Sequence, residues 1–285
     1  MAIKTVGVVG CGLMGSGIVQ VSAQAGFSTV VVEANEGLLD KGLSGIRKTL
    51  DGLVAKAKLD AQEKDAILGR ITGGTRLEDL KACDIVVEAI SENQSLKNET
   101  FAKLDRICPP HAVLASNTSS CNITAMAAAT KRAGQVLGLH FFNPVPLMKL
   151  VEVVRTILTD EGSFKLAWEW VQAMGKVPVD VKDSTGFIVN RLLIPYLLEA
   201  IRVYESGLAS LEDVDQAMKL GCGHPMGPFG LLDLVGLDTA MYVAEVMFEE
   251  FREARYAPPP LLKRMVLAGR LGRKSGRGFY DYSKQ

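Results

Sequence analysis

The sequence predicts an α/β protein, in which a doubly wound, mostly parallel sheet is followed by an all-helical C-terminal domain. In the first part of the chain, short apolar runs alternate with helical stretches, a pattern typical of a parallel sheet with helices on both faces. Past about residue 184 the periodicity becomes helical and no clear strand follows. We therefore expect a sheet domain at residues 1–183 and a helical domain at residues 184–285.

Local composition and spacing predict each element in turn. Short apolar runs bounded by turn residues predict strands at 5–9, 28–32, 85–89, 112–116, 136–140, 150–155 and 177–181. Between them, helical spacing predicts helices at 13–25, 37–58, 61–69, 98–108 and 123–129. In the second domain it predicts helices at 186–204, 211–220, 229–251 and 260–268. Pro195 should kink the first of these, and Ser210 to Asp213 resembles a capping box that starts the second.

The turn after the first strand carries the pattern G-x-G-x-x-G. Gly10 allows the tight turn, Gly12 lets the backbone approach a pyrophosphate, and Gly15 allows close packing of helix and strand. The N-terminus of the following helix favours an anion, so Leu13 and Met14 would also lie against the ligand. The pattern predicts a Rossmann-type dinucleotide site. The alternative is a purely structural glycine turn.

Glu33, at the end of the second strand, indicates which dinucleotide binds. A carboxylate there accepts hydrogen bonds from a ribose diol and repels a 2′-phosphate, and no arginine follows it directly. We therefore expect NAD rather than NADP. The alternative is a solvated glutamate at a strand end.

Composition limits the classes of binding partner and the cellular compartment that we expect. The net charge is zero, so we expect neither a nucleic acid nor an anionic membrane as partner. The first residues lead straight into a strand, so we expect no signal peptide, and no apolar run is long enough to span a bilayer. The five cysteines are odd in number and lack C-x-x-C spacing, which predicts reduced thiols, no metal site and a cytoplasmic protein.

One of the three histidines stands out by its position. His140 ends an apolar run at the carboxyl end of an expected strand, and Glu152 lies within the next apolar run. A buried carboxylate needs a partner, and a neighbouring strand, parallel or antiparallel, would offer His140. A carboxylate that orients an imidazole is typical of a catalytic dyad, and oxidation of an alcohol needs a base for the hydroxyl proton. The alternative is a structural His–Glu pair.

Two further polar groups interrupt apolar stretches. Residues 116–120, Ser-Asn-Thr-Ser-Ser, end a strand and precede a helix. We expect a serine or threonine there to cap that helix, which leaves the other side chains for substrate or nicotinamide. Asn190 lies in an apolar helix, where a buried amide needs a hydrogen-bond partner. That partner is either part of the protein or a substrate carbonyl.

Together these stretches resemble the 3-hydroxyacyl-CoA dehydrogenase family, and the chain length resembles the short bacterial 3-hydroxybutyryl-CoA dehydrogenase type. The resemblance covers the whole chain and implies NAD-linked, reversible oxidation of a (3S)-3-hydroxyacyl-CoA to a 3-ketoacyl-CoA. The matching stretches are GCGLMGSG near the N-terminus, VVEAISEN at 86–93, SNTSS at 116–120, HFFNPVPLMKLVEVV at 140–154, DSTGFIVNRLL at 183–193 and KSGRGFYDY at 274–282.

Matched motif by motif, the resemblance also implies roles for individual residues. His140 would be the general acid or base, with Glu152 orienting it, Asn190 on the substrate carbonyl and Ser119 on the reacting oxygen. Positions that contact NAD in the family match Glu92, Lys97, Ser119, Asn143 and Lys274. The coenzyme A tail would lie along the helix after Glu33, where Thr49 and Lys56 match. Many relatives have Asp in place of Glu33, which leaves the preference for NAD over NADP less strict.

Lysines and arginines on the helix after Glu33 suit a ligand with phosphates, although a solvated helix face is the alternative. The second domain is unusually apolar for its size, which predicts a homodimer through that domain; the alternative is an ordinary helical core.

Two other functions stay open. One is an NAD-linked dehydrogenase of a free hydroxy acid, which would need an arginine clamp for the carboxylate. The other is a non-catalytic dinucleotide-binding protein on the same fold.

Overall fold

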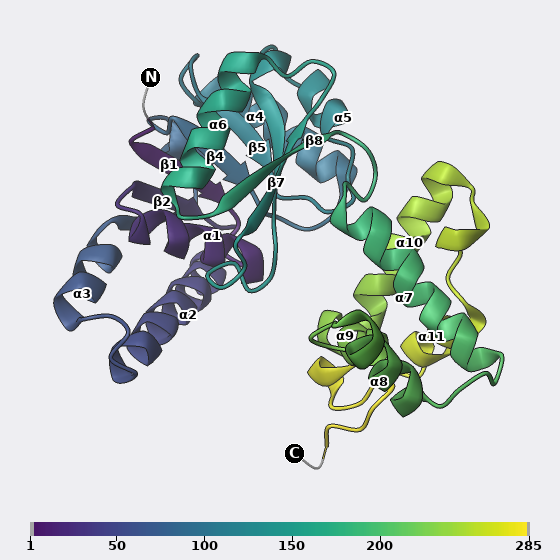
Figure 1. Ribbon diagram of the computed structural model, residues 1–285. Coiled ribbons are helices and arrows are strands. Elements are labelled where there is room, and N and C mark those ends of the chain that lie inside the picture. The colour runs from purple at the N-terminus through teal and green to yellow at the C-terminus, as the bar shows by residue number, and fades with distance from the viewer. Residues whose placement is uncertain (1–2, 284–285) are drawn as a thin grey trace. The chain divides into compact units, whose positions relative to one another are not determined.

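The computed structural model describes residues 3–283, and the chain divides into two compact units, residues 1–184 and residues 185–285 (Figure 1). The first two residues, which belong to the segment from which we expected no signal peptide, lie outside the described residues. Across residues 3–283, no helix is both long enough and apolar enough to cross a membrane.

Within the described residues, the first unit contains one sheet with the strand order β3-β2-β1-β4-β5-β6-β7-β8. Strands β1 to β6 are mutually parallel, whereas β7 runs antiparallel to β6 and β8 runs parallel to β7. The expected mostly parallel sheet is therefore confirmed. The strands are β1 Thr5–Val9, β2 Ser28–Val32, β3 Ile71–Gly74, β4 Ile85–Glu88, β5 Val113–Ser116, β6 Val136–Phe141, β7 Leu150–Arg155 and β8 Val177–Lys182.

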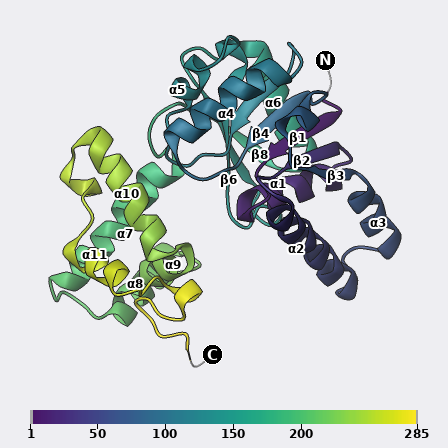
Figure 2. The same cartoon turned by 180° about the vertical axis from the view of Figure 1, so that it is seen from behind.

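Helices cover both faces of this sheet. In two opposite views, α6 lies in front of the sheet in one and behind it in the other, with α4 and α5 on the other face (Figures 1 and 2). The buried side chains of Val8, Ile18, Val153 and Trp170 belong to one apolar cluster, which joins the sheet to α1 and α6. The helices are α1 Leu13–Gln24, α2 Glu36–Ala55, α3 Ala61–Gly69, α4 Gln94–Ile107, α5 Ile123–Ala128 and α6 Glu161–Ala173.

Two elements of this unit, strand β3 and helix α6, were not predicted from the sequence. Strand β3 is a short edge strand with sequence ITGG, and its glycines weaken the strand pattern. Helix α6 begins after Asp160, whose side chain accepts a hydrogen bond from the Ser163 N–H. It buries Phe164, Ala167 and Val171, so its helical spacing was visible in the sequence.

The second unit is helical, as expected. Ser210 caps α8 by accepting the Asp213 N–H at 3.1 Å, and its hydroxyl donates to the Asp213 carboxylate at 2.7 Å, so the predicted helix start is confirmed. The prediction of one helix over 229–251 is wrong, because Gly236 has φ +100° and separates α9 from α10. The helices are α7 Val189–Glu205, with Pro195 inside it, α8 Leu211–Cys222, α9 Pro228–Val235, α10 Leu237–Phe251 and α11 Pro260–Leu267.

A buried carboxylate holds the C-terminal segment of this unit against α9. Asp233 accepts the N–H groups of Phe279 and Tyr280 at 2.9 Å each and the Tyr282 hydroxyl at 3.1 Å. A Cβ on Gly278 would overlap with the Asp233 carboxylate, so only glycine fits there. The glycine and aromatic residues of the KSGRGFYDY stretch therefore have a structural role inside the second unit.

Candidate active site

Five of the parallel strands carry the predicted residues at their carboxyl ends, at one edge of the sheet, which is where ligands bind in open α/β sheets. The glycine loop follows β1, Glu33 follows β2, and the segment with Glu92 follows β4. Ser119 follows β5, and His140 lies near the end of β6. The structure thus brings these predicted residues to the same edge of the first unit.

His140 and Glu152 are direct partners across the antiparallel β6–β7 pair. Opposite residues in such a pair point to the same face of the sheet, so the two side chains meet. Nδ1 of His140 lies 2.6 Å from Oε2 of Glu152, and the side chains are 8% and 1% exposed. With Nδ1 held by the carboxylate, Nε2 is the ring nitrogen that can exchange a proton with a bound molecule.

Two neighbouring residues contact strand β6 and the His140 ring. The buried Asn117 amide accepts the Phe141 N–H at 3.0 Å and so ties the turn after β5 to the end of β6. The Phe142 ring lies 4.5 Å from the His140 ring, measured between centroids. The role of Asn117 could not be predicted from the polar run at 116–120, because its partner is the backbone of a residue far along the sequence.

The glycine loop has the geometry that a phosphate requires. Gly10 has φ +98°, and a Cβ on Gly15 would overlap with the Gly10 carbonyl oxygen, so both positions need glycine. A Cβ on Gly12 would meet nothing within 4 Å, so the loop faces open space there. Helix α1 has no side-chain cap, which leaves its first N–H groups for an anion. The residues present therefore fit the pyrophosphate of a dinucleotide. Leu13 and Met14 belong to the same turn.

Glu33 is held by the backbone around it. Its Oε2 accepts the Cys11 N–H and its Oε1 accepts the Ala34 N–H, each at 2.7 Å. Burial, and secondarily the Glu33 charge, raises the pKa of the Cys11 thiol to about 11, so Cys11 is not a reactive thiolate at neutral pH. A Cβ on Gly42 would overlap with Cys11, so α2 packs closely on the loop.

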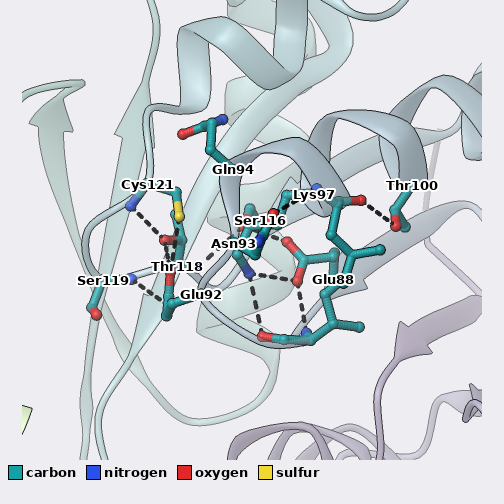
Figure 3. Close-up of polar contacts among 12 residues, drawn as sticks. Glu88, Glu92, Asn93, Gln94, Lys97, Thr100, Ser116, Thr118, Ser119 and Cys121 are labelled. Atoms are coloured by element: carbon teal, nitrogen blue, oxygen red, sulfur yellow. Dashed lines mark hydrogen bonds and ion pairs between the residues drawn. The ribbon is translucent and has the colours of Figure 1, made fainter.

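The Glu92 carboxylate holds the turn after β5 in place through several hydrogen bonds (Figure 3). It accepts the Thr118 hydroxyl at 2.5 Å, the Ser119 N–H at 3.2 Å and the Cys121 thiol at 3.2 Å. We expected a serine or threonine of this turn to cap the next helix, and that prediction is wrong. Asn122 caps α5 by accepting the Ala125 N–H, because the helix begins at Ile123 and its N-cap position therefore lies beyond the 116–120 run.

The remaining predicted residues lie on other helices and loops. Thr49 and Lys56 are exposed and seven residues apart at the end of α2, so about two helical turns place them on one side. Asn143 is exposed in the segment between β6 and β7, whereas Lys97 is buried in α4. In the second unit, Asn190 is half-buried in the first turn of α7, and Lys274 pairs with Asp238 at 2.6 Å. Among residues 3–283, no cluster of histidine, cysteine and acidic side chains could hold a metal.

A glycine loop, an acid after the second strand and a His–Glu pair at the carboxyl edge of a parallel sheet are together typical of nicotinamide-dependent dehydrogenases. Sequence comparison narrows this class. Residues 5–184 match the 3-hydroxyacyl-CoA dehydrogenase NAD binding domain, and residues 186–282 match the C-terminal domain of the same family. The chain belongs to the 3-hydroxyacyl-CoA dehydrogenase family. It is an oxidoreductase, and its cofactor is NAD.

Relatives match along essentially the whole chain. A 3-hydroxybutyryl-CoA dehydrogenase of Mycobacterium tuberculosis is 54% identical over 283 residues, which are 99% of each chain. The crystal structure of M. tuberculosis FadB2 has a TM-score of 0.97 at 54% identity and covers 99% of this chain and 100% of its own. That of (S)-3-hydroxybutyryl-CoA dehydrogenase PaaH1 from Ralstonia eutropha has a TM-score of 0.95 at 46% identity, with 99% of both chains covered.

Replacing Glu33 tests the cofactor preference. In Glu33→Arg, the acceptor for the ribose hydroxyls is lost and a cation for a 2′-phosphate is gained. Since a hydrogen bond to a charged group is worth about 1.5–3 kcal/mol, kcat/KM for NADH relative to NADPH should fall at least about tenfold. Steady-state kinetics with both cofactors measure this ratio. Glu36→Gln, at an exposed position on α2, is the control. An unchanged ratio in Glu33→Arg would contradict the assigned role.

Proposed function

We propose that this protein catalyses the reversible, NAD-dependent oxidation of (3S)-3-hydroxybutyryl-CoA to acetoacetyl-CoA. The observation that carries the proposal is the buried His140–Glu152 contact of 2.6 Å at the carboxyl edge of the sheet. Relatives and structures named 3-hydroxybutyryl-CoA dehydrogenase that match over nearly their whole length support the choice of substrate.

In this proposal, His140 is the general base. Its Nε2 takes the proton of the 3-hydroxyl group while the carbon–oxygen single bond becomes a carbonyl. Glu152 accepts the Nδ1–H, keeps the ring in this tautomer and stabilises the imidazolium that forms. In the reverse direction His140 returns the proton to the developing alkoxide. The hydroxyl of Ser119 would hydrogen-bond the reacting oxygen, and Asn190 would hydrogen-bond the substrate carbonyl.

NAD supplies the hydride acceptor when it is bound. Gly10, Gly12 and Gly15, with Leu13 and Met14, would hold its pyrophosphate at the start of α1, and Glu33 would accept the adenosine ribose hydroxyls. Glu92, Ser119, Asn143 and Lys274 are the proposed contacts toward the nicotinamide end. The fixed Glu92–Ser119 turn supports this assignment, because it presents a rigid polar surface beside β5.

The coenzyme A tail is proposed to lie along α2. Thr49 and Lys56 are exposed on one side of that helix, and Lys48 adds a further cation for phosphate groups. The close packing of α2 on Cys11 supports a shared platform, because it fixes this helix relative to the proposed pyrophosphate loop.

The direct test compares acetoacetyl-CoA with free acetoacetate as oxidants of NADH. We expect turnover with the thioester and little with the free acid, because only the thioester engages α2. In His140→Gln the rate should fall at least about a hundredfold, since a positioned general acid contributes roughly 10²–10⁴. NADH binding, measured by its fluorescence, should stay near the wild-type value. Equal rates with both oxidants would sink the CoA assignment, and a fully active His140→Gln would sink the mechanism.

We also propose a cytoplasmic homodimer that assembles through the second unit. Free thiols at all five cysteines support a reducing compartment. Large apolar side chains on the second unit support a partner surface. Leu192, Leu208, Leu220 and Leu267 are each more than 70% exposed.

The oligomeric state can be measured directly. Light scattering on the purified protein should return about twice the chain mass of 30.7 kDa. Because Leu192 is 71% exposed on α7, Leu192→Glu should shift the mass toward that of one chain. The control is Leu158→Glu, at an exposed position of the first unit, which should leave the mass unchanged. A wild-type protein with the mass of one chain would contradict the proposal.

A further inference from the structure

A buried lysine that the proposed mechanism does not use lies directly before β8. Lys176 is 8% exposed, in the turn between α6 and that strand. Its Nζ donates hydrogen bonds to the carbonyl oxygens of Val145, at 2.6 Å, and Met148, at 2.8 Å. No carboxylate within residues 3–283 pairs with this ammonium group, and burial lowers its pKa. Two backbone carbonyl groups are therefore the partners of this charge.

Both carbonyl groups belong to the loop between β6 and β7, residues 142–149. This loop carries Asn143, a proposed contact with the nicotinamide end of NAD. Two N–H groups of the loop bond to the Pro144 carbonyl at 3.0 Å each, so these bonds lie inside the loop. They shape the loop but do not join it to the rest of the unit. The hydrogen bonds from Lys176 join two points of the loop to the segment that starts β8.

The same loop packs against α1 at Val145. The Val145 side chain is 2% exposed, and a Cβ on Gly17 of α1 would lie 2.7 Å from the Val145 Cβ. Glycine at position 17 therefore leaves room for this side chain. Gly17 belongs to the GCGLMGSG stretch but lies beyond the three glycines of the G-x-G-x-x-G pattern. Val145 is thus held twice, by α1 at its side chain and by Lys176 at its carbonyl oxygen.

The position of Asn143 follows from the backbone of this loop. Asn143 is exposed, and within residues 3–283 no hydrogen bond holds its side chain. It lies two residues before Val145, so a displaced Val145 carbonyl would move Asn143 as well. A hydrogen bond from an ionised donor is stronger than one between neutral groups. The two bonds from Lys176 therefore limit where Asn143 can lie.

We infer that Lys176 is a positioning residue for the cofactor, which fixes the β6–β7 loop so that Asn143 reaches the nicotinamide end of NAD. The inference rests on the proposed contact of Asn143 with NAD. Lys176 acts on the cofactor through the two loop carbonyl groups that it holds.

A double-mutant cycle tests the inference with Lys176→Met, Asn143→Ala and both together. Methionine keeps most of the apolar stem and removes the ammonium group, so both carbonyl groups lose their donor. We expect the Kd for NADH to rise at least about fivefold in Asn143→Ala and at least about threefold in Lys176→Met. When residue 143 is already alanine, Lys176→Met should change the Kd less than about 1.5-fold, because no contact is left to position.

Titration of NADH fluorescence measures these constants without any acyl-CoA, so the test stands even if the proposed substrate is wrong. Lys149→Met, at an exposed lysine of the same loop, is the control and should bind NADH as wild type does. With acetoacetyl-CoA, Lys176→Met should raise KM for NADH and leave kcat at saturating NADH within about threefold. Strand pairing, rather than the loop, holds His140 opposite Glu152.

Hydrogen exchange tests the loop itself. In Lys176→Met, the amides of residues 142–149 should exchange faster than in wild type, while those of β6 and β7 keep their protection. Unchanged exchange in the loop would contradict the inference, because the lysine would then not hold it.

The binding data can overturn the inference in two ways. One is wild-type NADH binding by folded Lys176→Met while Asn143→Ala binds more weakly. The other is a loss in Lys176→Met that persists in full when residue 143 is alanine. Unchanged binding by Asn143→Ala would instead remove the proposed Asn143 contact, and the inference with it. Circular dichroism melts show which variants are folded at the assay temperature.

A second substitution covers a failure to fold. If Lys176→Met does not fold, Lys176→Gln, which keeps an amide donor on a shorter stem, takes its place in the cycle with the same expected direction. If neither variant folds, Lys176 serves the stability of the first unit, and the inference is overturned.

Discussion

The structure depends on the antiparallel pairing of β6 with β7 in an otherwise mostly parallel sheet. A shift by one residue would turn Glu152 to the face opposite His140, because side chains alternate along a strand. The neighbouring pairs Leu139–Val153 and Phe141–Val151 are buried apolar residues on the other face, so a shift would also remove them from the apolar cluster on that face. Burial of apolar side chains on one face thus enforces the polar contact on the other.

Three other carboxylates hold the loops at the carboxyl edge of the sheet. Glu33, Glu88 and Glu92 each accept a backbone N–H from their own or a neighbouring loop. Each acid therefore fixes a loop that follows a parallel strand, where the fold itself leaves the backbone without regular partners. These carboxylates therefore hold the loops in place through hydrogen bonds, in addition to placing negative charge at this edge.

Sequence patterns predicted the local features well. The glycine loop and Glu33 lie within one strand–helix–strand unit, so spacing alone was enough. His140 and Glu152 were predicted as partners, but the direction of β7 depends on the intervening turn and could not be read from either strand. The burial of Lys97 was missed because its partner, Glu88, ends a strand and no periodicity links the two. The break at Gly236 was missed because a single glycine within an apolar helical run does not reveal its φ.

In the proposed mechanism, His140 and Glu152 act as one unit. A double-mutant cycle tests it with His140→Gln, Glu152→Gln and both together, assayed with acetoacetyl-CoA at saturating NADH. Residues that act as a unit show strongly non-additive losses. We expect Glu152→Gln to lower kcat in the wild-type background, yet to cost less than about threefold when His140 is already glutamine. Losses that multiply in the double variant would contradict it.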